Sequence, residues 1–317
     1  MTGLVTFGET MASLAAVDVG PLRHQPHLHL HIGGAESNVA IAVRRLGGAA
    51  TWIGRVGDDE LGELVLAQIR AEGVDVGHAV VDAGAPTGLM IKSRRTATVT
   101  RVAYYRSGSA GSRIAPSDVP ADVVRGAGVL HVTGITPALS ASAREATFAA
   151  VEEARAARVP VTLDVNHRAA LWGADEAASV LTDLVARVDV LFAGEDEAEL
   201  LLSGPASGAE AALRALAALG PASVVLKRGT RGALALVDEV VVDVPPHPVV
   251  AVDSVGAGDA FVGGYLAELL AGGDAKARLT TAAACGAFAV TVHGDWEGLP
   301  SRRDLALLAT PTGTVVR

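Results

Sequence analysis

Short apolar runs of strand-forming residues recur about thirty residues apart through the middle of the chain, and alanine-rich segments separate them. The apolar runs are residues 129–132, 159–165, 188–192 and 223–227. The segments between them that read as helices are residues 142–157, 176–186 and 209–219. Because parallel strands need long crossovers, usually helical ones, this alternation predicts βαβ units and a parallel sheet.

Two closer strands follow at residues 233–237 and 240–244, and only Asp238 and Glu239 separate them. A loop of two residues predicts a β-hairpin, so the sheet should be antiparallel near one edge. We therefore expect the α/β class with a mostly parallel central sheet. Ligands of such open sheets bind beyond the carboxyl ends of the strands.

Two segments break this rhythm. Residues 12–32 and 87–106 alternate apolar and polar positions, the second as two short strands around residues 94–97. We expect them to pair as a small sheet that projects from the core and covers the site as a lid. The predicted organisation is a single domain over residues 1–317, with a lid subdomain formed by residues 12–32 and 84–113. An exposed strand edge on this lid would allow a homo-oligomer to form.

Three histidines at alternate positions, His27, His29 and His31, raise the question of a metal site. Residues on one strand face lie about 6.6–7 Å apart, too far for three ligands to reach one zinc ion without a bend. We therefore predict a solvated strand face rather than a metal centre.

The composition excludes several classes of protein. Of the 317 residues 50% are hydrophobic and 19% charged, enough for a large core, and the net charge is −9. No run of Lys and Arg marks a nucleic-acid partner, and no stretch of about 20 apolar residues predicts a membrane span. The single cysteine, Cys285, excludes an internal disulfide framework, so we expect a cytoplasmic protein with this thiol buried.

The string from Asp253 to Asp259 (D-S-V-G-A-G-D) carries the chemistry. It follows an apolar run at 249–252 that reads as a strand, and it opens a helix whose one buried face begins at Phe261 and which stops at Gly272. Small residues at a helix start leave N–H groups open to a phosphate, and an aspartate there can accept a proton from an attacking hydroxyl. Capping alone also explains an aspartate in a first turn. The whole string favours phosphoryl transfer.

A second glycine turn, Gly33-Gly34, opens a helix with an apolar face that ends at Gly47. Glycine lets the backbone approach a polar ligand closely, and Asn38 lies one turn further in, where its amide can bond a hydroxyl. An ordinary helix start is the alternative explanation.

Together these two turns resemble the two signatures of the ribokinase-like (phosphofructokinase-B, PfkB) carbohydrate kinases. The resemblance implies a three-layer α/β/α fold. It also implies that Asp259 is the catalytic base, with Gly256, Ala257 and Gly258 around the transferred phosphoryl group. Gly34, Asn38 and Asp253 take substrate-binding roles by the same resemblance.

Further strings resemble the nucleotide side of the same family. Residues 227–232 look like its K-x-G-x-x-G loop, which implies ATP-binding roles for Lys227, Gly229, Thr230 and Gly232, beside Gly256 and Gly258. Residues 192–197 resemble its N-x-x-E motif, so Glu197 is the candidate ligand of Mg²⁺, although Gly194 stands where asparagine is usual. Ala283 likewise replaces an asparagine near the nucleotide. ATP and Mg²⁺ are the expected cofactors, and a monovalent cation such as K⁺ is a further candidate.

The substrate side points to an acid. Tyr104 and Arg106 share one strand face, and Arg168 follows the carboxyl end of the 159–165 strand. Guanidinium groups suit carboxylates, although surface positions would explain each arginine separately. Their neighbouring strings look like 2-keto-3-deoxygluconate kinases, which implies substrate contacts from Tyr104, Arg106, Arg168 and Asp295. Met90 stands where several relatives have a tyrosine, so one hydroxyl contact is missing.

The sequence therefore predicts an ATP-dependent sugar-acid kinase that phosphorylates a primary hydroxyl, the 6-hydroxyl of 2-keto-3-deoxygluconate. The alternatives are a fructokinase or other neutral-sugar kinase of the same fold, and a non-catalytic nucleotide- or sugar-binding regulator. A Rossmann oxidoreductase and a P-loop enzyme are disfavoured, because neither glycine fingerprint is present.

Overall fold

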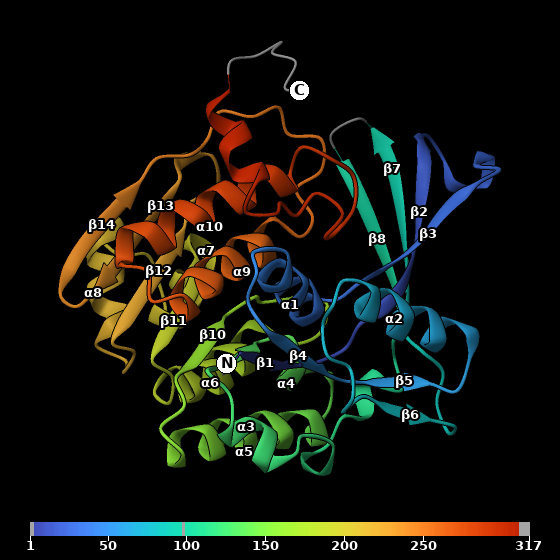
Figure 1. Cartoon of the computed structure of the whole chain (residues 1–317), viewed down its shortest axis with the longest axis horizontal. Coiled ribbons are helices and arrows are strands. Elements are labelled where there is room, and N and C mark those ends of the chain that lie inside the picture. The colour runs from blue at the N-terminus through green and yellow to red at the C-terminus, as the bar shows by residue number, and fades with distance from the viewer. Residues whose placement is uncertain (1–2, 97–98, 311–317) are drawn as a thin grey trace.

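The computed structural model describes residues 3–96 and 99–310. Its central sheet has eight strands in the order β14-β13-β12-β11-β10-β9-β1-β4 (Figure 1). These strands are β1 (Leu4–Phe7), β4 (Ala50–Ile53), β9 (Val129–Thr133), β10 (Val161–Asp164), β11 (Val190–Gly194), β12 (Ser223–Lys227), β13 (Ala233–Val237) and β14 (Val240–Val244). All pairs from β12 to β4 are parallel, and the β12–β13 and β13–β14 pairs are antiparallel. The mostly parallel sheet with one antiparallel edge is confirmed.

Helices cover both faces of this sheet and complete the expected three layers (Figure 1). One layer contains α1 (Ala35–Arg45), α2 (Glu60–Ala71), α9 (Ala257–Leu270) and α10 (Ala275–Ala289). The other contains α3 (Ala121–Arg125), α5 (Ala141–Ala156), α6 (Ala174–Val185), α7 (Glu195–Leu202) and α8 (Ala209–Ala217), with the short α4 (Thr136–Leu139) nearby. Neighbouring strand residues serve opposite layers: Val129 and Phe192 pack toward the first, Leu130 and Leu191 toward the second. Alternating strand residues thus build two cores.

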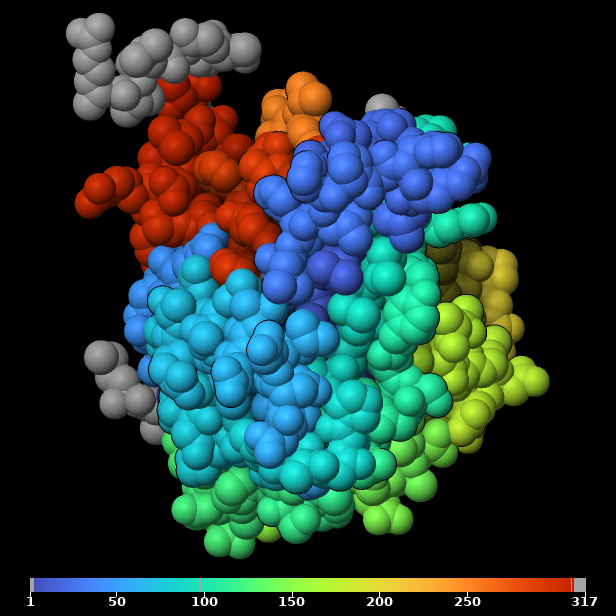
Figure 2. Space-filling model, turned by 90° about the vertical axis from the view of Figure 1, so that its right-hand side faces the viewer, coloured from blue at the N-terminus to red at the C-terminus, as the bar shows by residue number. Residues whose placement is uncertain are grey.

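The two segments expected to form a lid do pair as a four-stranded sheet in the order β3-β2-β7-β8, which we call the lid sheet. Its strands are β2 (Met11–Val19), β3 (Leu28–Gly33), β7 (Leu89–Thr96) and β8 (Val99–Tyr105). Figure 2 faces this side of the molecule, where the blue lid-sheet residues lie above the lighter-blue α2. Residue 97 of the expected turn lies outside the described residues.

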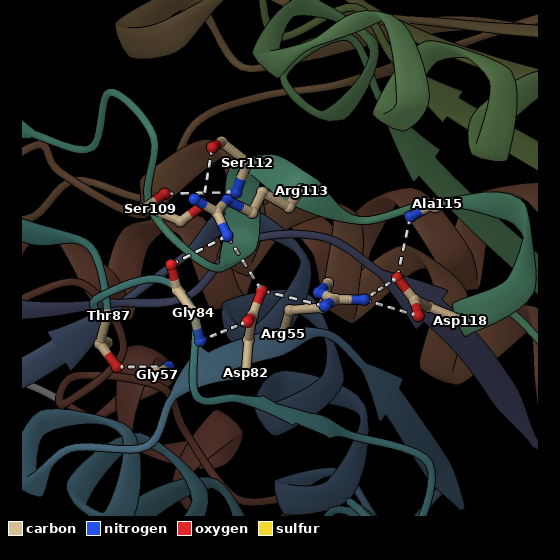
Figure 3. Close-up of polar contacts among 10 residues, drawn as sticks. All are labelled: Arg55, Gly57, Asp82, Gly84, Thr87, Ser109, Ser112, Arg113, Ala115 and Asp118. Carbon is tan, nitrogen blue, oxygen red and sulfur yellow. Dashed lines mark hydrogen bonds and ion pairs between the residues drawn. The ribbon is translucent and has the colours of Figure 1, made fainter.

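A polar network holds the base of the lid sheet to the core (Figure 3). Arg55 lies in β5 (Arg55–Gly57), which pairs with β6 (Val80–Asp82), and its guanidinium bridges the carboxylates of Asp82 and Asp118. Asp59 caps α2 by accepting from Gly62 N at 2.7 Å and also accepts from the Thr87 hydroxyl. The chain entering β7 and the chain leaving β8 are therefore fixed at one place. Short 3₁₀ turns occupy Leu22–His24, Gly111–Arg113, Pro116–Asp118, Gly229–Arg231 and Asp304–Ala309.

The structure corrects three local expectations. Residues 249–252 are not a strand: Val250 is 84% exposed, and prolines at 245, 246 and 248 remove the N–H groups that a strand ladder needs. Helix α9 is buried on every side from Asp259 to Ala267, because it lies between α1 and α10, and not along one face only. Of the three histidines, His29 is solvated as predicted, whereas the His31 ring is largely buried and binds Glu297 at 2.9 Å.

None of the helices in the described part of the chain is long and apolar enough to cross a lipid bilayer. No group of three or more His, Cys, Asp or Glu side chains in residues 3–96 and 99–310 is arranged to hold a metal ion.

Candidate active site

A cavity of about 640 Å³ lies between the lid sheet and the carboxyl ends of the central strands. Half of the predicted site residues line it: Gly34, Asn38, Met90, Tyr104, Arg106, Arg168, Gly256, Asp259 and Asp295. A second cavity, of about 600 Å³, is lined by residues such as Leu4, Ala50 and Asp122 and by none of the predicted ones. The first cavity is therefore the candidate active site.

Asp259 lies in the first turn of α9, buried at the cavity wall. Asn38 donates from Nδ2 to its Oδ2 at 2.8 Å, and Asn166 donates to Oδ1 at 3.4 Å. Burial raises the pKa of Asp259, while the Asn38 bond and the positive charge of Arg168 oppose that rise. A raised pKa makes the carboxylate a stronger proton acceptor near neutral pH. The sequence analysis did not identify Asn166, although it directly follows the end of the β10 region.

The turn before Asp259 requires glycine. Gly256 has a positive φ of 76°, and a Cβ there would lie 1.9 Å from the carbonyl oxygen of Asp295. The N–H groups of the first helical turn, which include those of Ala257 and Gly258, have no intrahelical acceptor. Such N–H groups at the positive end of a helix dipole suit an anion, and the role of this turn around a phosphoryl group stays a prediction.

Lys227 supplies a positive charge beside this turn. A Cβ on Gly258 would lie 3.7 Å from Lys227 Nζ, which donates to Asp164 Oδ1 at 2.5 Å. Burial alone would lower the pKa of Lys227, but Asp164 and Glu197 raise it above its usual value, so the ammonium keeps its charge. Asp164 therefore pairs with Lys227. It does not pair with Arg168, although such a pair would be expected if Arg168 were only a turn residue at the surface.

Apart from Gly256, the predicted nucleotide-side residues do not line the cavity, Lys227 and Gly258 included. Gly229 and Thr230 form the 3₁₀ turn after β12, and Gly232 has a φ of 80° with Val244 O where a Cβ would be. Ala283 is half-buried on α10. These four positions remain predictions as ATP contacts.

Two predicted acids bind backbone amides. Glu197 accepts from Gly194 N at 2.6 Å and from His167 N at 2.9 Å, so it caps α7 and holds the loop that carries Arg168. Its role as a Mg²⁺ ligand stays a prediction. Asp253 does not line the cavity, and its carboxylate accepts from Val255 N within the same turn.

Three buried charged residues line the cavity that the sequence analysis did not identify: Glu9, Glu36 and Lys92. Glu9 accepts from Arg106 through Nε at 2.7 Å and Nη2 at 2.6 Å, and Arg106 also lies over the Tyr104 ring. The Arg106 side chain is thus oriented, and its Nη1 has no hydrogen bond within the described part of the chain. The only sequence signal for Glu9 was its place just after the first strand.

The remaining charges differ in how they are paired. Glu36 accepts from the hydroxyls of Thr133 at 2.6 Å and Thr136 at 2.8 Å, and burial raises its pKa. Lys92 forms an ion pair with Asp295. Arg168 is exposed, and within residues 3–96 and 99–310 its guanidinium has no ion pair or hydrogen bond. It is therefore the cation best placed to receive an anionic ligand.

Comparison with known proteins identifies similar sugar kinases. A 2-dehydro-3-deoxygluconokinase of Thermoproteus tenax is 40% identical over 308 residues, covering 96% of this chain and 93% of the relative. Fructokinase-1 of Oryza sativa subsp. japonica is 31% identical, covering 96% and 97%. The crystal structure of a protein described as ribokinase II from E. coli, in complex with ATP and Mg²⁺, superposes with a TM-score of 0.89 at 26% identity, covering 98% and 99%.

The family comparison covers nearly the whole chain. Residues 1–302 match the pfkB family of carbohydrate kinases. That match agrees with the glycine turn, the buried aspartate and the mostly parallel sheet. This protein belongs to the pfkB family of carbohydrate kinases and is a phosphotransferase that acts on an alcohol group.

Proposed function

We propose that this kinase transfers the γ-phosphoryl group of ATP to the 6-hydroxyl of 2-keto-3-deoxygluconate, which is also called 2-dehydro-3-deoxygluconate. One observation carries the proposal: the buried Asp259 carboxylate lines the same cavity as the Arg168 guanidinium, which has no partner among the residues that the structure describes. One group suits a hydroxyl that must lose its proton. The other suits a carboxylate at the far end of the same molecule.

Asp259 accepts the hydroxyl proton while the hydroxyl oxygen forms its bond to phosphorus and the bond to the ADP oxygen breaks. Asn38 and Asn166 hold the two carboxylate oxygens in place. The N–H groups of the α9 turn and the Lys227 ammonium stabilise the charge on the phosphoryl oxygens. These donors fit a polyphosphate, and Glu197 is the residue that would help to hold Mg²⁺. When bound, ATP supplies the phosphoryl group and Mg²⁺ neutralises part of its charge.

Two arginines support an acid rather than a neutral sugar. Arg168 has no partner among the described residues, and Arg106 keeps Nη1 available because Glu9 engages only Nε and Nη2. The gluconokinase relative is also more similar to this chain than the fructokinase, at 40% against 31% identity. One observation favours the neutral-sugar alternative: Glu9 already cancels the charge of Arg106.

The lid sheet, the domain organisation, a second copy of the chain and a monovalent cation belong to the proposed function as well. The lid sheet excludes water from the cavity, and residues 1–317 act as one cytoplasmic kinase domain. The edges of β3 and β8 are unpaired in the described chain and offer a surface for a second copy. A monovalent cation such as K⁺ is proposed as an additional requirement.

An ADP-release assay with Mg²⁺ and equal concentrations of 2-keto-3-deoxygluconate, fructose and ribose tests the proposal. We expect kcat/KM to be highest for the deoxy-keto acid. A higher kcat/KM for fructose would refute the acid assignment and leave the kinase assignment in place.

A further inference from the structure

Lys92 lies in β7 with only 3% of its surface exposed, an unusual position for a lysine. Its ammonium forms an ion pair with Asp295, which lies 203 residues later in the loop after α10. Both side chains line the 640 Å³ cavity. A lone buried ammonium is strongly unfavourable, so this pairing explains how the lysine can be there.

The pairing uses only one oxygen of Asp295. Oδ1 binds Lys92, whereas Oδ2 lies 2.4 Å from the place where a Cβ on Gly33 would be. The methyl group of Met90 reaches the same place, also at 2.4 Å. A side chain at position 33 would collide with this oxygen. Met90 offers no hydrogen bond, whereas Asp295 Oδ2 has no hydrogen bond among the described residues and can accept one from a sugar hydroxyl.

Charge gives Lys92 a second effect. The ionisable carboxyl groups that line the cavity are those of Glu9, Glu36, Asp259 and Asp295. Arg106 is paired with Glu9 and Lys92 with Asp295, while burial raises the pKa of Glu36 and the charge of Arg168 acts on Asp259. Without Lys92, Asp295 would add an uncompensated negative charge to a cavity that receives an anion.

The protonation state of Lys92 fits this arrangement. Burial lowers the pKa of Lys92 to about 8, and the negative charges of Asp253, Glu297 and Asp259 oppose that fall. The adjoining Asp295 carboxylate also favours the charged form. The ammonium is therefore present at neutral pH.

We propose that Lys92 is a positioning and specificity-determining residue of the sugar site. It fixes Asp295 so that Oδ2 accepts a hydrogen bond from a secondary hydroxyl of the sugar, and it cancels the Asp295 charge so that an anionic sugar can enter. The charge effect rests on the proposed function, since it takes the substrate to be a sugar acid. The positioning effect applies to any sugar that the kinase phosphorylates.

Four variants test this role in steady-state assays: Lys92→Met, Lys92→Arg, Asp295→Asn and the double variant Lys92→Met/Asp295→Asn. For Lys92→Met we expect KM for 2-keto-3-deoxygluconate to rise about 10- to 100-fold, the size of one lost charged hydrogen bond, with kcat and KM for ATP little changed. Lys92→Arg should recover most of the affinity. The double variant should bind the acid more tightly than Lys92→Met, because its unpaired charge is gone.

Arg94→Ala is the matched control. Arg94 lies on the same strand and contacts His293 of the same loop at 2.9 Å, but it does not line the cavity. If Arg94→Ala raises KM as much as Lys92→Met, the lysine only ties the lid sheet to the core, and the proposal fails. Unchanged KM in Lys92→Met, or a double variant no better than Lys92→Met, would also overturn it.

Two further measurements separate this proposal from its premise. If Lys92→Met does not fold, as judged by thermal melting, Asp295→Asn carries the test and should raise KM for the sugar with kcat retained. If the wild type prefers fructose, the proposed substrate is wrong. The Lys92 variants are then assayed with fructose to test the positioning role. A change in KM for fructose of less than about threefold is smaller than the effect of one hydrogen bond and would refute that role.

Discussion

Replacing Asp259 by asparagine tests the role of the buried carboxylate while keeping its shape. The amide oxygen can still accept from Asn38, whose bond is 2.8 Å long. Only the contact with Asn166 changes, and at 3.4 Å it is a long hydrogen bond worth less than about 1 kcal/mol. Loss of binding geometry therefore contributes little, and the expected effect is the loss of a general base.

General-base catalysis contributes about 10²- to 10⁴-fold, so we expect kcat to fall by that factor, which equals about 2.7–5.5 kcal/mol in the barrier. KM for ATP should change little, because Asp259 faces the sugar side of the phosphoryl group. Single-turnover measurement of ADP release separates this chemical step from product release. A kcat within threefold of the wild type would remove Asp259 from its proposed role.

Asp118→Asn provides the matched control for that substitution. Asp118 is also a buried aspartate, but it pairs with Arg55 at the base of the lid sheet and lies outside the cavity (Figure 3). We expect this variant to melt at a lower temperature and to keep most of its kcat. Equal loss of kcat in both variants would show that the effect of Asp259→Asn is structural.

Three further predictions concern the same site. Arg168→Ala should raise KM for 2-keto-3-deoxygluconate about 10- to 100-fold and leave fructose nearly unaffected, because it removes a charged hydrogen-bond donor; equal effects on both sugars in the ADP-release assay would contradict this. Asp259→Asn should melt at a higher temperature than the wild type at pH 8. The raised pKa means that ionised Asp259 destabilises the fold above its folded pKa, and the difference should shrink as the pH falls toward 4. Gly256→Ala should lose activity and about 1–3 kcal/mol of stability in denaturant unfolding, because its φ is 76° and the Asp295 carbonyl occupies the Cβ position.

The sequence pattern predicted the strands whose pairing is set by neighbouring residues in the chain. The hairpin strands 233–237 and 240–244 have the expected bounds, because a two-residue loop between two apolar runs specifies them. The run at 249–252 has the same apolar character but lies at the end of a segment with three prolines. Within the described residues it makes one backbone hydrogen bond, from Val252 N to Val290 O. An apolar run alone was therefore not enough to predict a strand at residues 249–252, because the run has no neighbouring strand to pair with in the described chain.

The site divides in the same way. Asp259 and Asn38 were predicted because each lies in a recognisable glycine turn at a helix start. Glu9 and Lys92 were missed because their meaning depends on partners 97 and 203 residues away, Arg106 and Asp295. The spacing of residues along the sequence does not predict ion pairs between residues so far apart. Lys92 in an alternating strand is indistinguishable from a solvent-facing lysine until the fold is known.

Strand β3 of the lid sheet ends at Gly33 and helix α1 begins at Ala35. The end of this lid strand and Asn38 therefore belong to one short stretch of chain. A sugar bound against Gly34 would restrain the start of the helix that carries Asn38, and with it the carboxylate that Asn38 binds at 2.8 Å. Sugar binding and orientation of the base would share one structural element.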